Sequence, residues 1–194
     1  AVNISVCSLL PLLDAPIVVL VFTPTALNAL IWNRAARVVL HQRQRSGCPA
    51  IHADDLGLDA GVDSAILELA EAGRLTSASL LVAGPTAPSA AAAWQSLANT
   101  QPLVLHLCLT EGPQPQDCPD LPAGFGDLLL GSLRPAKRHA LRAQVETAVQ
   151  SRTHRCQQLA GQRQIHLGGH EHVHLRPLVL EVVLEQREIV WVRT

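Results

Sequence analysis

Three groups of ionisable side chains follow apolar runs of the length of a β-strand. Asp54 and Asp55 end the run CPAIHADD, His106 lies within PLVLHLCLTEG, and a histidine-rich stretch, HLGGHEHVH, covers residues 166–174. Carboxylates and imidazoles are the ligands that Zn²⁺ and related divalent ions take in proteins. If the three runs are neighbouring strands, we expect these side chains to meet around one metal ion.

The histidine-rich stretch brings imidazoles together in either regular conformation. On a strand, His170, His172 and His174 share one face because side chains alternate. On a helix, His166, His170 and His174 share one face through their spacing of four residues. One ion cannot bind all four histidines, so we expect the others to surround the ligands or to contact substrate. A histidine-rich surface loop without a metal is the alternative.

The other candidates also have ordinary structural explanations. An Asp-Asp pair after a strand is commonly a turn or a helix cap, and His106 alone could be a hydrogen-bonded core residue. Cys108 lies two residues after His106, on the same face of a strand, but no base is identified that would activate it as a nucleophile. The metal hypothesis therefore depends on all three groups meeting.

Strands and helices alternate from Cys48 onward. The expected strands cover residues 48–55, 77–84, 102–112 and 164–177, the expected helices cover 61–75, 86–99 and 136–161, and a short helix followed by a final strand is expected within 177–194. Gly73 fits the end of the first helix, and residues 112–135, rich in proline and glycine, are expected to form a long surface loop. This alternation predicts βα units around a parallel sheet or barrel. In such folds, sites assemble at the carboxyl ends of the strands.

Residues 1–48 differ in character from the rest. Residues 15–33 carry no charge and could form a membrane segment, a buried strand and helix, or sequence foreign to the domain. Pro16, Pro24 and Asn28 within the run, and the lack of basic residues before it, count against a membrane segment. We therefore expect no membrane segment, and the scattered cysteines, as reduced thiols, indicate a cytoplasmic protein.

Composition excludes several classes of partner and site. A net charge of -1, 3% aromatic residues and no tyrosine give no basis for binding nucleic acid. The five cysteines are scattered without a C-x-x-C pair, which argues against a disulfide framework or a thiolate zinc site.

Three ordered blocks resemble the signature blocks of the YdjC-like carbohydrate deacetylases. They are IHADDLGLDAGVDSAILELAEAGRLTSASLLVAGP, LHLCLTEGPQP and HLGGHEHVHLRPLVLEVVLE, and the resemblance covers residues 49–194. It implies a division into an atypical apolar segment, 1–48, and a deacetylase domain, 49–194. It also implies an α/β fold of the TIM-like (β/α) barrel type, and metal-dependent hydrolysis of N-acetyl groups on amino sugars, with Mg²⁺ or Zn²⁺ as cofactor.

The resemblance assigns roles to individual residues. Asp55, His106 and His170 fall on the metal ligands of the family, and Asp54 falls on the general base. Asp54 beside a metal would remain ionised, as a proton acceptor must. His172 or His174 could contact substrate or steady the oxyanion, and the sequence does not choose between them.

The chain departs from the family pattern in three ways. Gly168 stands where the H-L-D-x-H block has aspartate, and Leu56 stands where A-D-D-F-G has phenylalanine. The sequence ends at Thr194, whereas family members usually continue through further βα units. We therefore expect an incomplete barrel. Either residues 1–48 cover its open edge, or a second copy of the chain covers it in a homo-oligomer, or the fold is only marginally stable. The alternative function is a degenerate member that binds metal or sugar without turnover.

Overall fold

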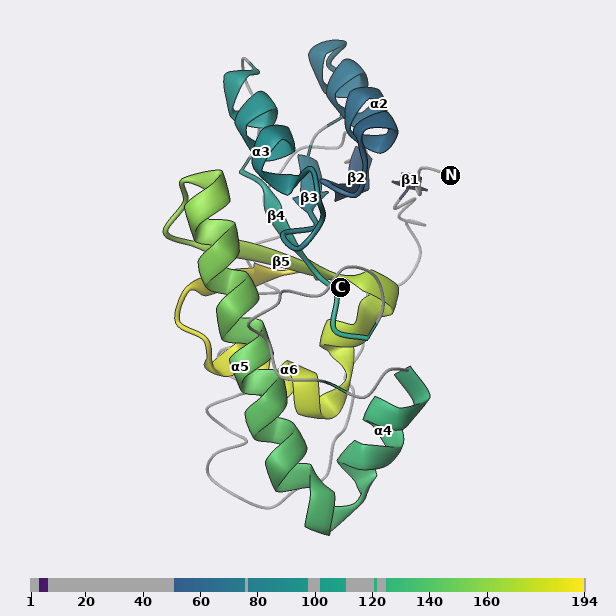
Figure 1. The fold of residues 1–194 in the computed structure, drawn as a ribbon, viewed down its shortest axis with the longest axis vertical. Coiled ribbons are helices and arrows are strands. Elements are labelled where there is room, and N and C mark those ends of the chain that lie inside the picture. Colours follow the sequence, from purple (N-terminus) through teal and green to yellow (C-terminus); the bar gives the residue numbers. More distant parts are fainter. Residues whose placement is uncertain are drawn as a thin grey trace, which may run out of the picture.

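A six-stranded sheet forms the centre of the part that the computed structural model describes, namely residues 4–6, 51–75, 77–97, 102–110, 121 and 125–193 (Figure 1). Its strands are β1 (Ile4–Val6), β2 (Ile51–Leu56), β3 (Ser77–Leu80), β4 (Val104–Leu107), β5 (Ile165–Gly169) and β6 (Ile189–Val192). They lie side by side in sequence order, β2 to β6 are parallel, and β1 pairs antiparallel with β2. The predicted α/β fold with a parallel sheet is confirmed.

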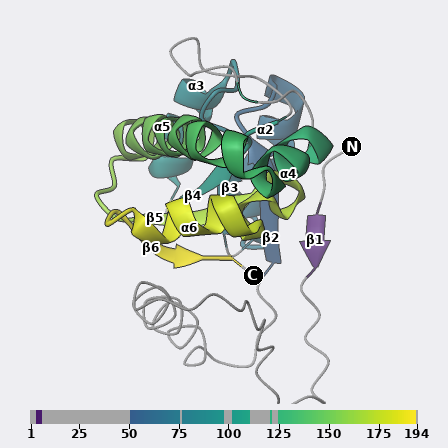
Figure 2. The ribbon, with the colours of Figure 1, turned by 90° about the horizontal axis from the view of Figure 1, so that it is seen from below.

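Helices join the parallel strands. They are α2 (Ala60–Glu71), α3 (Ala87–Ser96), α4 (Phe125–Leu133), α5 (Pro135–Ala160) and α6 (Pro177–Glu185). Crossovers between parallel strands are right-handed, so strands that follow one another in order place their helices on one face of the sheet. Figure 2 shows α3, α4 and α5 on the same side of β5 and β6. The other face of the sheet is therefore free of these helices.

Local signals explain the ends of the helices. The Asp59 carboxylate accepts hydrogen bonds from the backbone N–H groups of Gly61 and Val62, at 2.8 and 2.9 Å, and so caps α2. Gly73, just after α2, has a φ of 66°, and Gly161, after α5, has a φ of 64°. Glycine adopts this left-handed conformation at little cost, and helices commonly end in this way. The helix end expected at Gly73 is confirmed.

The two faces of the sheet differ in polarity. The side chains that face the helices are fully buried and apolar: Ala53, Ala78, Leu80, Leu105, Leu107, Ile165 and Leu167. Side chains alternate along a strand, so the opposite face carries a polar set: His52, Asp54, Ser77, Ser79, His106 and His166. Parallel sheets are usually apolar on both faces. A single polar face leaves the core on one side and a place for chemistry on the other.

The sheet is curved, with its polar face inside. The Arg193 guanidinium, just after β6, lies 3.0 Å from a carboxylate oxygen of Asp54 in β2. Four inter-strand steps, about 19 Å along the sheet, separate these strands. An arginine and an aspartate side chain cannot bridge that distance across a flat sheet. β2 and β6 therefore approach each other across a concave polar face.

The expectation of a loop over residues 112–135 is wrong for its second half. Residues 125–133 form α4, in which Leu128 is buried. A Cβ atom on Gly131 would lie 3.0 Å from a methyl group of Leu141 in α5, so glycine lets the two helices approach closely. The burial of Leu128 and the close approach at Gly131 offset the low helix propensity of the glycines.

Several expectations concern residues outside the described ranges. Segment 15–33 and most of residues 111–124 are among them. Within the described ranges, no helix is long and apolar enough to cross a membrane. Cys108 and Cys156, both described, are buried.

The buried face of β4 gives a test of the core. Leu105 is fully buried, so Leu105→Ala should lower the free energy of unfolding by about 2–5 kcal/mol, through lost burial and a residual cavity. Leu130→Ala is the matched control, because that side chain is 54% exposed and its loss should cost less than about 1 kcal/mol. Urea denaturation measures both, and equal losses would contradict the assignment of the core.

Candidate metal centre

Asp55, His106 and His170 meet at the carboxyl ends of β2, β4 and β5. One donor atom from each lies within 4.8 Å of the other two. His106 Nε2 is 3.1 Å from Asp55 Oδ1 and 3.3 Å from His170 Nδ1, and the two imidazole rings meet edge to face. Ligand atoms around one zinc ion lie roughly 3–4 Å apart. The three side chains therefore have the types and spacing of a metal-binding triad.

The chain turns sharply next to two of these residues. Asp55 has a φ of 69°, and the residues that follow His170, Glu171 and His172, have φ angles of 47° and 55°. Positive φ is uncommon outside glycine and costs on the order of 1–3 kcal/mol. Such strain collects at sites where the chain must present a side chain in one direction.

The histidine-rich stretch follows neither arrangement expected from the sequence. β5 ends at Gly169, and His170–Leu175 forms a 3₁₀ segment interrupted by the residues of positive φ. A continuous strand or helix over residues 166–174 is therefore wrong. Of the four histidines in the stretch, the structure brings only His170 into the triad.

Asp54 lies beside the triad within a dense set of hydrogen bonds and ion pairs. Ser79 Oγ donates to its Oδ1 at 2.7 Å, and Arg193 Nη2 donates to its Oδ2 at 3.0 Å. His52 Nε2 and His106 Nδ1 lie 3.2 and 3.5 Å from Oδ1. Burial alone would raise the pKa of Asp54, but its hydrogen bonds with these partners, the one with His106 first, outweigh burial and hold that pKa far below its usual range. Asp54 is therefore ionised at neutral pH.

Ser79 determines which nitrogen of His106 carries the proton. Its hydroxyl has a single hydrogen, which goes to the carboxylate of Asp54. Ser79 Oγ must therefore accept from His106 Nδ1, 3.0 Å away. In the neutral imidazole, Nε2 is then unprotonated and faces Asp55 and His170 with its lone pair. This arrangement suits a metal ligand, because the second ring nitrogen of such a histidine usually donates to a fixed acceptor.

The negative surroundings of His106 also favour a cation. Its burial lowers the pKa, but the hydrogen bonds and charges of Asp54 and Asp55 outweigh burial and raise it. The pKa of Asp55 is lowered, chiefly by the hydrogen bond that protonated His106 donates to it through Nε2–H. The same carboxylates that stabilise a proton on His106 would stabilise a divalent ion in its place.

Three residues that contact Asp54 were not identified from the sequence: His52, Ser79 and Arg193. His52 and Ser79 belong to the polar face of the sheet, and His52 Nδ1 also lies 2.7 Å from the hydroxyl of Ser77. Their alternation with apolar neighbours is the only signal in the sequence. Arg193 carries no local signal, because its contact with Asp54 joins residues 139 positions apart.

The structure does not bring His172 or His174 into the triad. His172 is exposed. His174 is fully buried, and its Nε2 lies 2.7 Å from the backbone oxygen of Arg193. Burial lowers the pKa of His174 to about 4. A contact of either residue with substrate stays a prediction.

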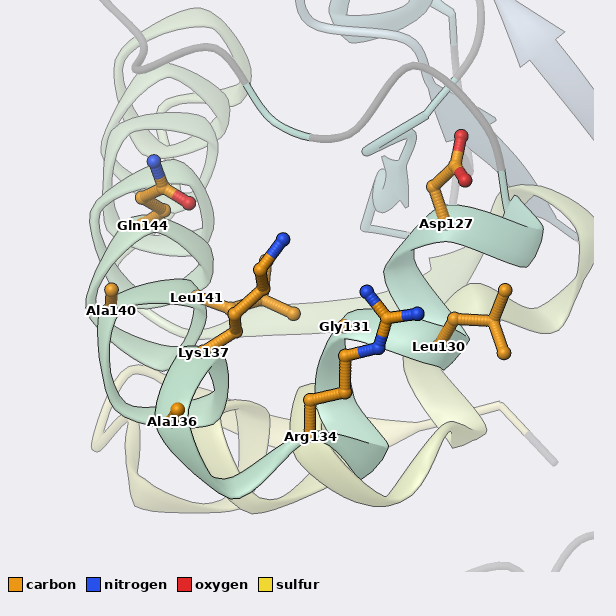
Figure 3. A pocket seen from close by; sticks show the side chains of 9 residues that line it. All are labelled: Asp127, Leu130, Gly131, Arg134, Ala136, Lys137, Ala140, Leu141 and Gln144. Carbon is orange, nitrogen blue, oxygen red and sulfur yellow. The ribbon is translucent and has the colours of Figure 1, made fainter.

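A separate hollow of about 490 Å³ lies between α4 and α5 (Figure 3). Arg134, Lys137 and Leu141 are among its lining residues, with Asp127 on the opposite wall. It contains none of the triad and no group of side chains with the spacing of metal ligands. Among the described residues, the possible metal ligands converge instead at the strand ends.

Comparisons with known proteins place these residues in a family context. The family model described as YdjC-like protein matches residues 50–194. A carbohydrate deacetylase of Brevibacillus brevis is 33% identical over 148 residues, covering 71% of this chain and 54% of the relative. The mouse carbohydrate deacetylase is 35% identical over 155 residues (74% and 48%), and a chitooligosaccharide deacetylase of Serratia marcescens is 29% identical over 134 residues (69% and 53%). The chain thus spans about half the length of these curated relatives.

The triad predicts a loss of metal binding when a ligand is removed. His106→Ala or His170→Ala should lower the affinity for Zn²⁺ by at least about 10-fold, since even loss of an outer-shell partner commonly costs that much. His172→Ala is the matched control, because His172 is exposed and outside the triad. Metal analysis after dialysis against buffered Zn²⁺ measures the effect. Equal metal content in all variants would contradict the site.

The burial of His174 predicts a pH dependence of stability. Its pKa is about 4 in the folded chain and 6.5 ordinarily, so between these values the unfolded chain binds the proton more readily. Stability that is present above pH 6.5 is therefore lost as the pH falls to 4, by on the order of 3 kcal/mol. Denaturant unfolding of the wild type and of His174→Gln over this range measures it. If the difference in stability between the two proteins stays constant with pH, the prediction is wrong.

Proposed function

This chain belongs to the YdjC-like protein family, and we propose that it carries a metal-dependent hydrolase site that removes N-acetyl groups from amino sugars or related glycoconjugates. The observation that carries the proposal is the convergence of Asp55, His106 and His170 beside the ionised carboxylate of Asp54. The names of the relatives support the choice of an N-acetylated sugar as substrate.

Hydrolysis of an acetamide needs an activated carbonyl, an activated water and a protonated leaving amine. A divalent ion such as Zn²⁺ or Mg²⁺, held by Asp55, His106 and His170, would polarise the carbonyl and lower the pKa of water. Asp54 accepts the proton of the attacking water, as a general base. Its partners keep it ionised, and its Oδ1 lies 3.5 Å from Nδ1 of His106, one of the proposed metal ligands.

His172 and His174 have different roles in the proposed site. His172 is exposed and lies two residues after the ligand His170, so it is the candidate for contact with the sugar or the oxyanion. His174 is buried against the backbone of Arg193, and it acts on the site through that residue.

We further propose that residues 49–194 form the deacetylase domain, with a sheet that is part of a TIM-like (β/α) barrel. Strands in sequence order, helices on one face and strong curvature of the sheet all support this reading. The polar face would then be directed to the barrel axis. The triad would lie at the carboxyl end of the barrel, where sites of such folds are found.

A second candidate function is binding of metal or sugar without turnover. The substitution that favours it is Gly168, at a position where the family's H-L-D-x-H block has aspartate. Turnover on an N-acetylated sugar distinguishes the two functions.

Asp54 gives the direct test. Asp54→Asn should lower kcat for acetate release from N-acetylglucosamine oligomers by about 10²- to 10⁴-fold while the metal stays bound, because it removes a proton acceptor and not a ligand. Asp127→Asn, on the exposed side of α4, is the matched control and should keep full activity. Undiminished acetate release from Asp54→Asn would contradict the role. Loss of the metal from that variant would make Asp54 a ligand instead.

A further inference from the structure

Arg193 is held at three points. Its guanidinium donates to Asp54 Oδ2 at 3.0 Å, and both side chains are largely buried, with 16% and 12% exposed. Its backbone N–H donates to the carbonyl of Leu167 in β5 at 2.8 Å. Its own carbonyl lies 2.7 Å from His174 Nε2. The backbone of Arg193 is thus held on both sides, and its guanidinium is held by Asp54.

His174 holds the backbone of Arg193, and its own ring is held by close packing. A Cβ atom on Gly169 would lie only 2.2 Å from His174 Nδ1, so no other residue fits at position 169 without displacing the imidazole. With Nε2–H donating to the carbonyl of Arg193, the buried ring holds the chain just beyond β6. The histidine-rich stretch therefore supplies one residue to the triad, His170, and one to the placement of Arg193.

Gly168 leaves room for the guanidinium. A Cβ atom there would lie 3.4 Å from Arg193 Nε and 3.7 Å from Cζ. The φ of Gly168 is not in the positive range, so its backbone does not require glycine. A carboxylate at this position would face the guanidinium and compete with Asp54 for it, since arginine pairs strongly with any carboxylate that its planar fork can reach.

We propose that Arg193 is a positioning residue for Asp54. We further propose that glycine at position 168 matters because a carboxylate there would compete with Asp54 for the guanidinium of Arg193. The guanidinium holds Oδ2 while the hydroxyl of Ser79 holds Oδ1, so the carboxylate is fixed from both ends. A fixed carboxylate matters because a displacement of about 1 Å can cost on the order of 10²-fold in rate. The catalytic part of this inference rests on the proposed function, whereas the pairing itself does not.

The pairing is tested without any activity measurement. Arg193→Ala opens a space beside Asp54 that should bind ethylguanidinium, which is detectable by calorimetry. The wild type and the double variant Arg193→Ala/Asp54→Asn should not bind it. Arg163→Ala is the matched control, because Arg163 is exposed at the opposite end of β5 and its loss should create no such site. Absence of binding to a folded Arg193→Ala, or equal binding to the double variant, overturns the pairing.

The positioning role is tested by acetate release from N-acetylglucosamine oligomers. Arg193→Ala should lower kcat at least about 10-fold with an unchanged metal content and a KM within about threefold, and ethylguanidinium should restore part of kcat. Arg193→Lys should keep more activity than Arg193→Ala. A wild type that releases no acetate contradicts the proposed function, while the binding experiment still decides the pairing. An active wild type with unchanged kcat in Arg193→Ala, or no rescue, overturns the positioning role.

Gly168 is tested by a pair of substitutions. Gly168→Asp should lower kcat more than Gly168→Ala does, because the new carboxylate draws the guanidinium away from Asp54. Thermal unfolding and metal content establish that both variants fold and bind metal. Equal or higher kcat in Gly168→Asp overturns the role of Gly168.

Discussion

Asp54 places a carboxylate in the interior of the concave face, and the surroundings must compensate its charge. An unpaired buried carboxylate would cost several kcal/mol or take up a proton. Here the partners come from different strands: His52 from β2 itself, Ser79 from β3, His106 from β4, and Arg193 from just after β6. One buried charge therefore joins strands that are distant in the sheet and holds the curvature on which the site depends.

The same charge determines the chemistry of the neighbouring triad. Because Ser79 gives its hydrogen to Asp54, it accepts from His106 Nδ1, and the Nε2 lone pair is left for a cation. Asp54 and Asp55 are adjacent in sequence yet serve different sides of His106, contacting Nδ1 and Nε2 respectively. The positive φ of Asp55 accompanies this division, since two consecutive residues of a regular strand would point to opposite faces of the sheet.

The polarity of the sheet separates stability from function. The apolar side chains of β2 to β5 are buried against the helices, and they form the core without any contribution from the site. The concave face contains polar and ionisable groups that form hydrogen bonds with one another, as Asp54 does with Ser79 and Arg193. The wide separation of these groups in the sequence means that the site forms only once the sheet is assembled.

Much of the molecule follows from local pattern. Apolar runs that alternate with amphipathic stretches were sufficient to predict the parallel sheet. The residue types at the strand ends were sufficient to predict a group of possible metal ligands there, and Asp55, His106 and His170 form such a group. Local pattern failed where long-range packing decides. Residues 125–133 are helical because Leu128 is buried, and residues 170–175 leave the strand in a strained turn. His174 is fully buried, with its Nε2 2.7 Å from the backbone oxygen of Arg193, a neighbour that the sequence did not indicate. Ser79 and Arg193 have no motif of their own, because their importance comes from the position of Asp54 and only tertiary structure brings that carboxylate to them.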